Sequence, residues 1–157
     1  MGRNWVDQPL VRAAWLALAV YLATSLSTAA ARPGGFHPGE AVIYLAALWY
    51  GPIYGVVAAG LGTGAAMFNT ALTSWGVLFT VIKVVEAGLI GSLASPDSPR
   101  QTVTAAALAV LWAVPATAIA MFFLFGAGVM QGSILLEAVR GLTAMAAAGL
   151  FVYWRTA

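Results

Sequence analysis

The chain has 157 residues, of which 62% are hydrophobic and only 8% are charged. Soluble domains carry about 25% charged residues, so most of the perimeter of this chain must face lipid. Its net charge of +2 is the difference between seven basic and five acidic residues, and the basic ones are spread over the whole sequence, which excludes the basic patch of a nucleic-acid-binding protein.

Continuous apolar runs rich in Ala, Leu, Val and Gly predict helices. Each unpaired backbone group costs several kcal/mol in lipid, so only helices or closed barrels cross a bilayer. Barrel strands would alternate apolar and polar residues over segments of about ten, and these runs do not. The sequence therefore predicts an all-α integral membrane protein. In chain order, we expect helices at 10–31, 40–50, 53–68, 75–94, 103–125 and 133–153.

The first run imitates a cleavable signal peptide, because two arginines precede it and the sequence Thr28-Ala-Ala-Ala31 ends it. The run is longer than a usual signal core, however, and Asp7 lies in the charged leader. We therefore expect a retained first helix.

The stretch 40–68 would be about 43 Å long as one helix, well beyond the roughly 30 Å hydrocarbon core. Gly51-Pro52 in its middle is a natural break, and splitting there gives a short second helix and six spans. With six spans and a cytoplasmic N-terminus, four arginines lie inside and one outside, as the positive-inside rule favours. These are Arg3, Arg12, Arg100 and Arg155 inside and Arg32 outside. The prediction is a six-helix transmembrane bundle with both termini cytoplasmic.

Charged side chains inside a bilayer are costly, by roughly 2.5 kcal/mol or more each at a helix centre, and usually serve function. Here all of them fall in the outer half or near the middle, and two pairs have i,i+3 spacing and share a helix face. They form either two self-neutralising ion pairs or an outward-open pocket for a polar small molecule, and their common depth favours the pocket. Trp75 at the outer mouth would stack on a ligand ring or anchor its helix. The candidate binding residues are His37, Glu40, Asn69, Trp75, Lys83, Glu86, Glu137 and Arg140.

Small residues form a second pattern, which in membranes marks close helix packing. The glycines from Gly60 to Gly64 are expected to pack inside the bundle. The first helix is the better candidate for a surface that docks on a partner, through Ala13, Ala17, Ala19 and Ala23.

Catalytic signatures are missing from the sequence. There is no Gly-rich phosphate motif, no nucleophile–base pair and no cysteine, and His37 is the only histidine. We expect no enzyme activity, no metal and no cofactor.

Two segments, Phe36–Gly55 and Phe79–Gly91, resemble the substrate-binding (S) components of energy-coupling factor (ECF) transporters. In the first, a polar lead-in with an acidic residue precedes an apolar helix and Gly-Pro. In the second, Lys83 follows an apolar triplet. The resemblance implies capture of a vitamin or related micronutrient at the outer face of a bacterial or archaeal cytoplasmic membrane. It also implies a transmembrane coupling protein, docked on the first-helix alanines, and two cytoplasmic ATPases.

Two departures leave the substrate open: Glu40 stands where the family often has Asp, and the loop after Asn69 is short. Three acidic and two basic groups with His37 and Trp75 suit a zwitterionic or heteroaromatic molecule, with pyrimidine- or thiamin-like compounds as a first guess.

The main rival interpretation is a membrane-embedded assembly or regulatory subunit whose buried charges are structural. A small stand-alone carrier is a second rival, although the short chain and the lack of a detectable inverted repeat argue against it.

Overall fold

The computed structural model describes residues 8–30, 38–68, 73–95 and 97–127, with ten residues between 134 and 154 (134, 135, 137–139, 141, 143, 146, 150 and 154). The helices are α1 (Pro9–Ala30), α2 (Pro38–Tyr50), α3 (Pro52–Val57), the π-helical η2 (Ala58–Thr63), α4 (Gly64–Phe68), α5 (Thr73–Leu93) and α6 (Pro99–Phe125). The ten residues at 134–154, here called the C-terminal segment, are also helical. Apart from one bridge between Ser95 and Ser98, the described residues form no β-structure, which confirms the all-helical prediction.

Three of these helices are long and apolar enough to cross a membrane: Pro9–Leu26, Ser74–Leu93 and Pro99–Phe125. The elements α3, η2 and α4 follow one another without a break and form a shorter apolar helix, Pro52–Phe68. The described elements fit the six helices expected from the sequence. The side of the membrane on which the termini lie stays a prediction.

The chain breaks between α2 and α3, where the sequence predicted it. Gly51 has φ 92°, a left-handed conformation that glycine adopts without steric cost. Pro52 then begins α3, where its missing N–H would have no helical acceptor. The α5 helix crosses this break so closely that a Cβ on Gly91 would lie 2.5 Å from the Cα of Pro52. Backbone contact at the break therefore fixes the position of one end of α5.

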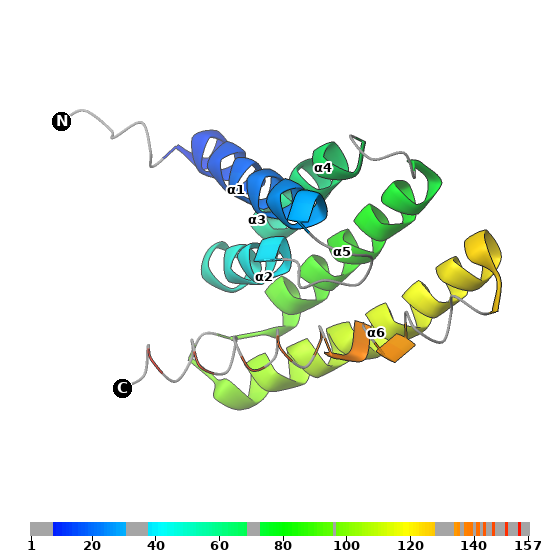
Figure 1. Ribbon diagram of the computed structural model, residues 1–157. Coiled ribbons are helices and arrows are strands. Elements are labelled where there is room, and N and C mark those ends of the chain that lie inside the picture. Colours follow the sequence, from blue (N-terminus) through cyan, green and yellow to red (C-terminus); the bar gives the residue numbers. More distant parts are fainter. Residues whose placement is uncertain are drawn as a thin grey trace.

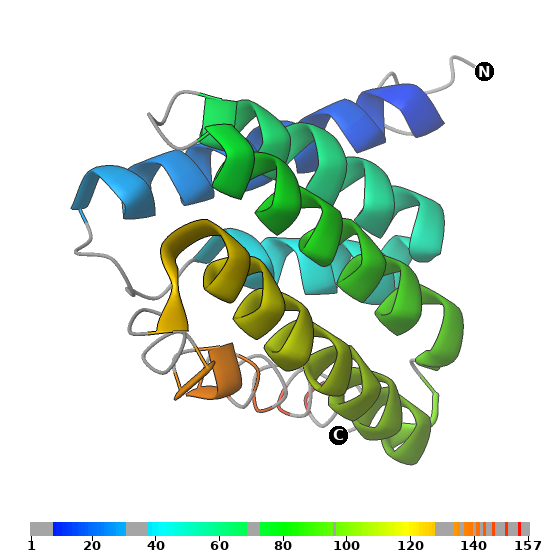
Figure 2. The ribbon, with the colours of Figure 1, turned by 90° about the vertical axis from the view of Figure 1, so that its right-hand side faces the viewer.

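The opposite end of α5 packs in the same way. A Cβ on Gly76, near the start of α5, would lie 2.8 Å from the Cβ of Met67 near the end of α4. Gly39, at the start of α2, packs against the side chain of Thr24 on α1. Consecutive helices thus run antiparallel, and Figures 1 and 2 show them crossing at an angle. We call the two ends of the bundle the Gly39 end and the Gly51 end.

Small residues let the helices approach closely in the core. A Cβ on Gly62 of η2 would lie 2.6 Å from the carbonyl oxygen of Ala17 and the Cβ of Val20 on α1. The C-terminal segment lies beside α6 in both views (Figures 1 and 2), where Gly141 packs on Val110. Large apolar side chains stay exposed on the outer faces of α1 and α6, as expected of surfaces in lipid; they include Leu10, Trp15, Leu22, Leu111, Ile119 and Phe123.

Candidate functional site

One lysine in the middle of the bundle contacts three carboxylates. Lys83 lies halfway along α5 and is 1% exposed. Its Nζ donates a hydrogen bond to Oε1 of Glu137 at 2.8 Å. The same nitrogen lies 2.8 Å from Oε2 of Glu86, one turn further along α5, and 3.2 Å from Oε1 of Glu40 in the first turn of α2. Helices α2 and α5 and the C-terminal segment therefore meet at one charged centre, here called the Lys83 cluster.

Two aromatic residues complete this centre. Tyr44, one turn after Glu40 on α2, is buried and donates its hydroxyl proton to Oε1 of Glu86 at 3.1 Å. The Lys83 ammonium lies 5.2 Å from the ring centroid of Phe79, within the range of a cation–π contact. The ring of Trp75 lies 5.5 Å from that of Phe79. Residues 75, 79 and 83 thus form a column along one face of α5, which leads from its first turn to the cluster.

The recessed start of α2 explains how Glu40 reaches the middle of the bundle. Gly39 packs against Thr24, which precedes the end of α1 by six residues, or about 9 Å of helix. The start of α2 is therefore recessed from the end of α1. A carboxylate in the first turn of α2 is consequently deep enough to meet Lys83.

The electrostatics of the cluster are unbalanced among the described residues, because three carboxylates share one ammonium. Burial of an ion costs several kcal/mol unless partners and hydrogen bonds compensate it. Oε1 of Glu40 and Oε2 of Glu86 are buried, and the Lys83 ammonium, at 3.2 and 2.8 Å, is their neighbour of opposite charge among the described residues. One ammonium thus serves all three carboxylates.

The structure brings together four of the predicted site residues: Glu40, Lys83, Glu86 and Glu137. Trp75 is half-buried at the start of α5. The other three, His37, Asn69 and Arg140, lie outside the described residues.

Helical spacing paired Lys83 with Glu86, and a common depth in the membrane grouped this pair with Glu40 and Glu137; the structure shows that Lys83 contacts all three carboxylates directly. The i,i+3 rule relates residues of one helix only, so it could not show contacts made from α2 and from the C-terminal segment. Sequence reasoning also omitted Tyr44 and Phe79 from the site. Their i,i+4 spacing from Glu40 and Lys83 was the signal that could have found them.

The alanines predicted to dock on a partner face different ways on α1. Ala17 is buried against η2 and is part of the internal packing, so it is removed from the docking surface. Ala19 is exposed, whereas Ala13 and Ala23 are half-buried.

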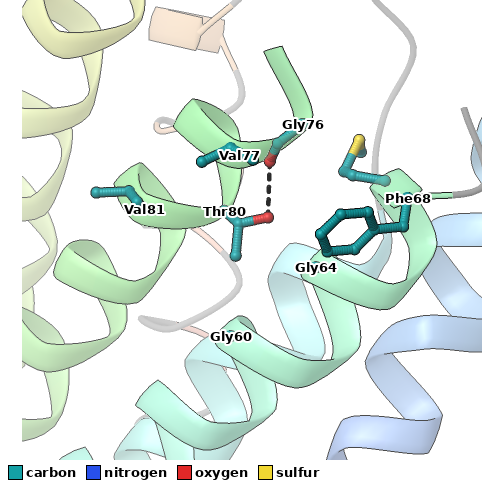
Figure 3. Close-up of a pocket in the computed structure, with 8 residues that line it drawn as sticks. Gly60, Gly64, Phe68, Gly76, Val77, Thr80 and Val81 are labelled. Carbon is teal, nitrogen blue, oxygen red and sulfur yellow. Dashed lines mark hydrogen bonds between the residues drawn. The ribbon is translucent and has the colours of Figure 1, made fainter. Parts of the chain in front are cut away.

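A groove of about 240 Å³ lies between the η2–α4 segment and the first half of α5, and no residue of the Lys83 cluster lines it (Figure 3). The Thr80 hydroxyl in its wall donates to the Gly76 carbonyl oxygen at 2.8 Å. Because that hydroxyl proton is already used and no charged side chain lines the groove, it offers little to hold a polar molecule. Its lining is Gly60, Gly64, Met67, Phe68, Gly76, Val77, Thr80 and Val81.

Comparison with known proteins gives one result. Residues 10–152 match the family model described as ECF-type riboflavin transporter, S component. No curated protein and no solved structure gives a significant match.

Proposed function

The chain belongs to the family of ECF-type riboflavin transporter S components, and on that premise we propose that it is the substrate-capture subunit of an ATP-driven micronutrient importer. It binds a vitamin or vitamin precursor in the outer half of the bundle, with the Lys83 cluster as the floor of the site. It is a membrane transport subunit and not an enzyme. Riboflavin is the first molecule to test, because the family description carries its name.

The observation that carries this proposal is the burial of four charged groups from three segments at one point. Buried ion pairs add little net stability compared with well-packed apolar residues. Ionisable groups within membrane-spanning helices usually mark a binding or transport path. A cluster of this kind therefore favours ligand binding over a purely stabilising role.

Orientation follows from the same proposal. The Gly39 end, where α2 is recessed and the column of aromatic residues begins, faces the outside. The Gly51 end then faces the cytoplasm, together with both termini. A transmembrane coupling protein docks on the exposed side of α1, around Ala19 and Ala23, and two cytoplasmic ATPases supply energy.

Transport in reconstituted membranes tests the proposal. Proteoliposomes containing the chain and an ECF coupling module should accumulate labelled riboflavin or another vitamin only when ATP is present on the ATPase side. Glu137→Gln should abolish accumulation, whereas Arg100→Gln, a change of an exposed residue in the first turn of α6, should not. Uptake without the module would favour a stand-alone carrier.

One observation favours a second function. The Lys83 ammonium already has three carboxylate neighbours, as expected of an assembly or regulatory subunit with a purely structural ion cluster. In that case the purified chain would bind no vitamin, and Glu137→Gln would change its stability without changing any transport activity.

A further inference from the structure

Two glycines in the wall of the groove between the η2–α4 segment and α5 are not required by the packing of the two helices. A Cβ on Gly60 would lie 3.5 Å from Cγ2 of Val84, and a Cβ on Gly64 would lie 3.7 Å from Cγ2 of Thr80, both ordinary van der Waals distances. On Gly62, between them, a Cβ would instead lie 2.6 Å from atoms of α1. Glycine destabilises a helix interior relative to alanine. What Gly60 and Gly64 provide in return is the open space of the groove.

The groove opens on the lateral surface of the bundle. Phe68, Val77 and Val81 line it and are all exposed, and Figure 3 shows the Thr80 side chain between the two helices. Its lining comes from the end of α4 and the beginning of α5, so the groove lies in the half of the bundle nearer the Gly39 end. Since this chain is a membrane protein with three helices long and apolar enough to span, the opening faces hydrocarbon.

The dimensions of the groove restrict its occupant. Gly60, Gly64 and Phe68 follow one another at every fourth residue along one helix face, a length of about 12 Å. Spread over that length, the volume of about 240 Å³ gives a mean cross-section of about 20 Å². A helix with its side chains is about 10 Å across, or about 80 Å² in section, so it would cover the rim without filling the groove. An extended hydrocarbon chain is thin enough to enter, and about 12 Å lies within one leaflet of a core roughly 30 Å thick.

The chemistry of the lining agrees with this choice. No described residue that lines the groove is charged, and the Thr80 hydroxyl donates its proton to the Gly76 carbonyl oxygen at 2.8 Å. Water would find few hydrogen-bond partners there, and an empty groove would lose the dispersion contacts of its walls. A lipid tail restores those contacts and requires no polar partner.

We propose that the groove binds one acyl chain of a membrane phospholipid, which lies along Gly60 and Gly64 in the leaflet at the Gly39 end. The chain joins α4 to the first half of α5, whose buried face carries Phe79 and Lys83. This inference goes beyond the proposed function and does not depend on it, because no residue of the Lys83 cluster lines the groove.

Filling the groove with a side chain tests the proposal. Gly64→Leu places an isobutyl group in the groove, where a Cβ has room. Ala65→Leu is the matched control, because Ala65 is exposed and does not line the groove. The dissociation constant of dioleoylphosphatidylcholine is measured by native mass spectrometry on the purified full chain. Gly64→Leu should weaken binding of the first lipid at least about tenfold, because tens of atomic contacts are lost together, and Ala65→Leu should bind it like the parent.

A photoreactive lipid locates the chain. Phosphatidylcholine with a diazirine in its acyl chain is irradiated in proteoliposomes, and the labelled residues are identified by mass spectrometry. Labels should concentrate on Val77 and Val81 relative to Leu111 and Ile119, which are exposed on α6 and do not line the groove. Gly64→Leu should remove this excess and leave the labelling of α6 unchanged.

A second variant guards against a folding defect. Gly60→Leu fills the other part of the groove, and circular dichroism reports the helix content of each variant. The proposal is wrong if both variants keep the helix content and the lipid affinity of the parent. It is also wrong if the groove of the parent is labelled no more than α6, a result that does not depend on either variant folding.

Two further outcomes would assign the groove to a helix. A parent chain that is dimeric in micelles and becomes monomeric on Gly64→Leu would make a second copy the occupant. Loss of the coupling protein from Gly64→Leu, but not from Ala65→Leu, would make a partner helix the occupant. Either result would overturn the acyl-chain assignment.

Discussion

Replacing Lys83 with methionine should be among the most destabilising single changes in this chain. The substitution keeps an unbranched side chain one atom shorter, and it removes an ammonium that lies 2.8, 2.8 and 3.2 Å from three buried carboxylates. Removal of one partner from a single buried ion pair costs about 3–5 kcal/mol, because the other charge is left uncompensated. Here three charges lose their partner, so we expect a loss of unfolding free energy at the upper end of that range. Proton uptake by the carboxylates limits the loss.

The free energy of unfolding is measured by titration with sodium dodecyl sulfate in mixed micelles, followed by circular dichroism. Arg100→Met removes an exposed positive charge and should stay within about 0.5 kcal/mol of the parent. Adding Glu86→Gln to Lys83→Met should recover only part of the loss, because Glu40 and Glu137 keep their charges. Full recovery in the double variant would show that Glu86 is the only effective partner. A Lys83→Met protein as stable as the parent would refute the ion cluster itself.

Three further predictions concern packing, topology and docking. Gly62→Ala should lower the free energy of unfolding by about 1–3 kcal/mol, because its Cβ would lie 2.6 Å from atoms of α1. Gly64→Ala is the control: its Cβ would lie 3.7 Å from the nearest neighbouring atom, so it should be neutral or stabilising in the same titration. Equal losses in the two variants would contradict the packing of η2 on α1. Cysteines introduced at Gly2 and Ala157 should both react with an impermeant maleimide only from the cytoplasmic side, and labelling from opposite sides would exclude an even number of spans. Ala19→Trp should reduce co-purification of the coupling protein without changing vitamin affinity, and unchanged co-purification would remove α1 as the docking surface.

Local chemistry made several features predictable from sequence. The Gly51-Pro52 break follows from the two residue types least compatible with a helix interior, and α2 and α3 indeed end and begin there. Lys83 and Glu86 share a face because they are one turn apart on α5, and the structure pairs them.

Direct contacts between residues of different helices could not be predicted from local sequence in the same way. That Glu40 and Glu137 share Lys83 depends on the recessed start of α2 and on the path of the C-terminal segment, and helical periodicity carries neither. Ala17 is a second example. Its spacing in α1 is compatible with a face that docks on a partner protein and equally with the inner face of α1, where Gly62 of η2 packs in the structure. Small-residue spacing identifies a close-packing face but not the helix that packs on it.

Ligand occupancy of the purified protein tests the central claim most directly. The chain is isolated from membranes of cells grown in rich medium, and the released small molecules are quantified by mass spectrometry against the same preparation of Glu137→Gln. The account predicts one vitamin-like compound at a molar ratio approaching one in the parent protein and its loss in the variant. Equal recovery from both proteins, or a parent that carries no compound and binds none when vitamins are added back, would contradict it.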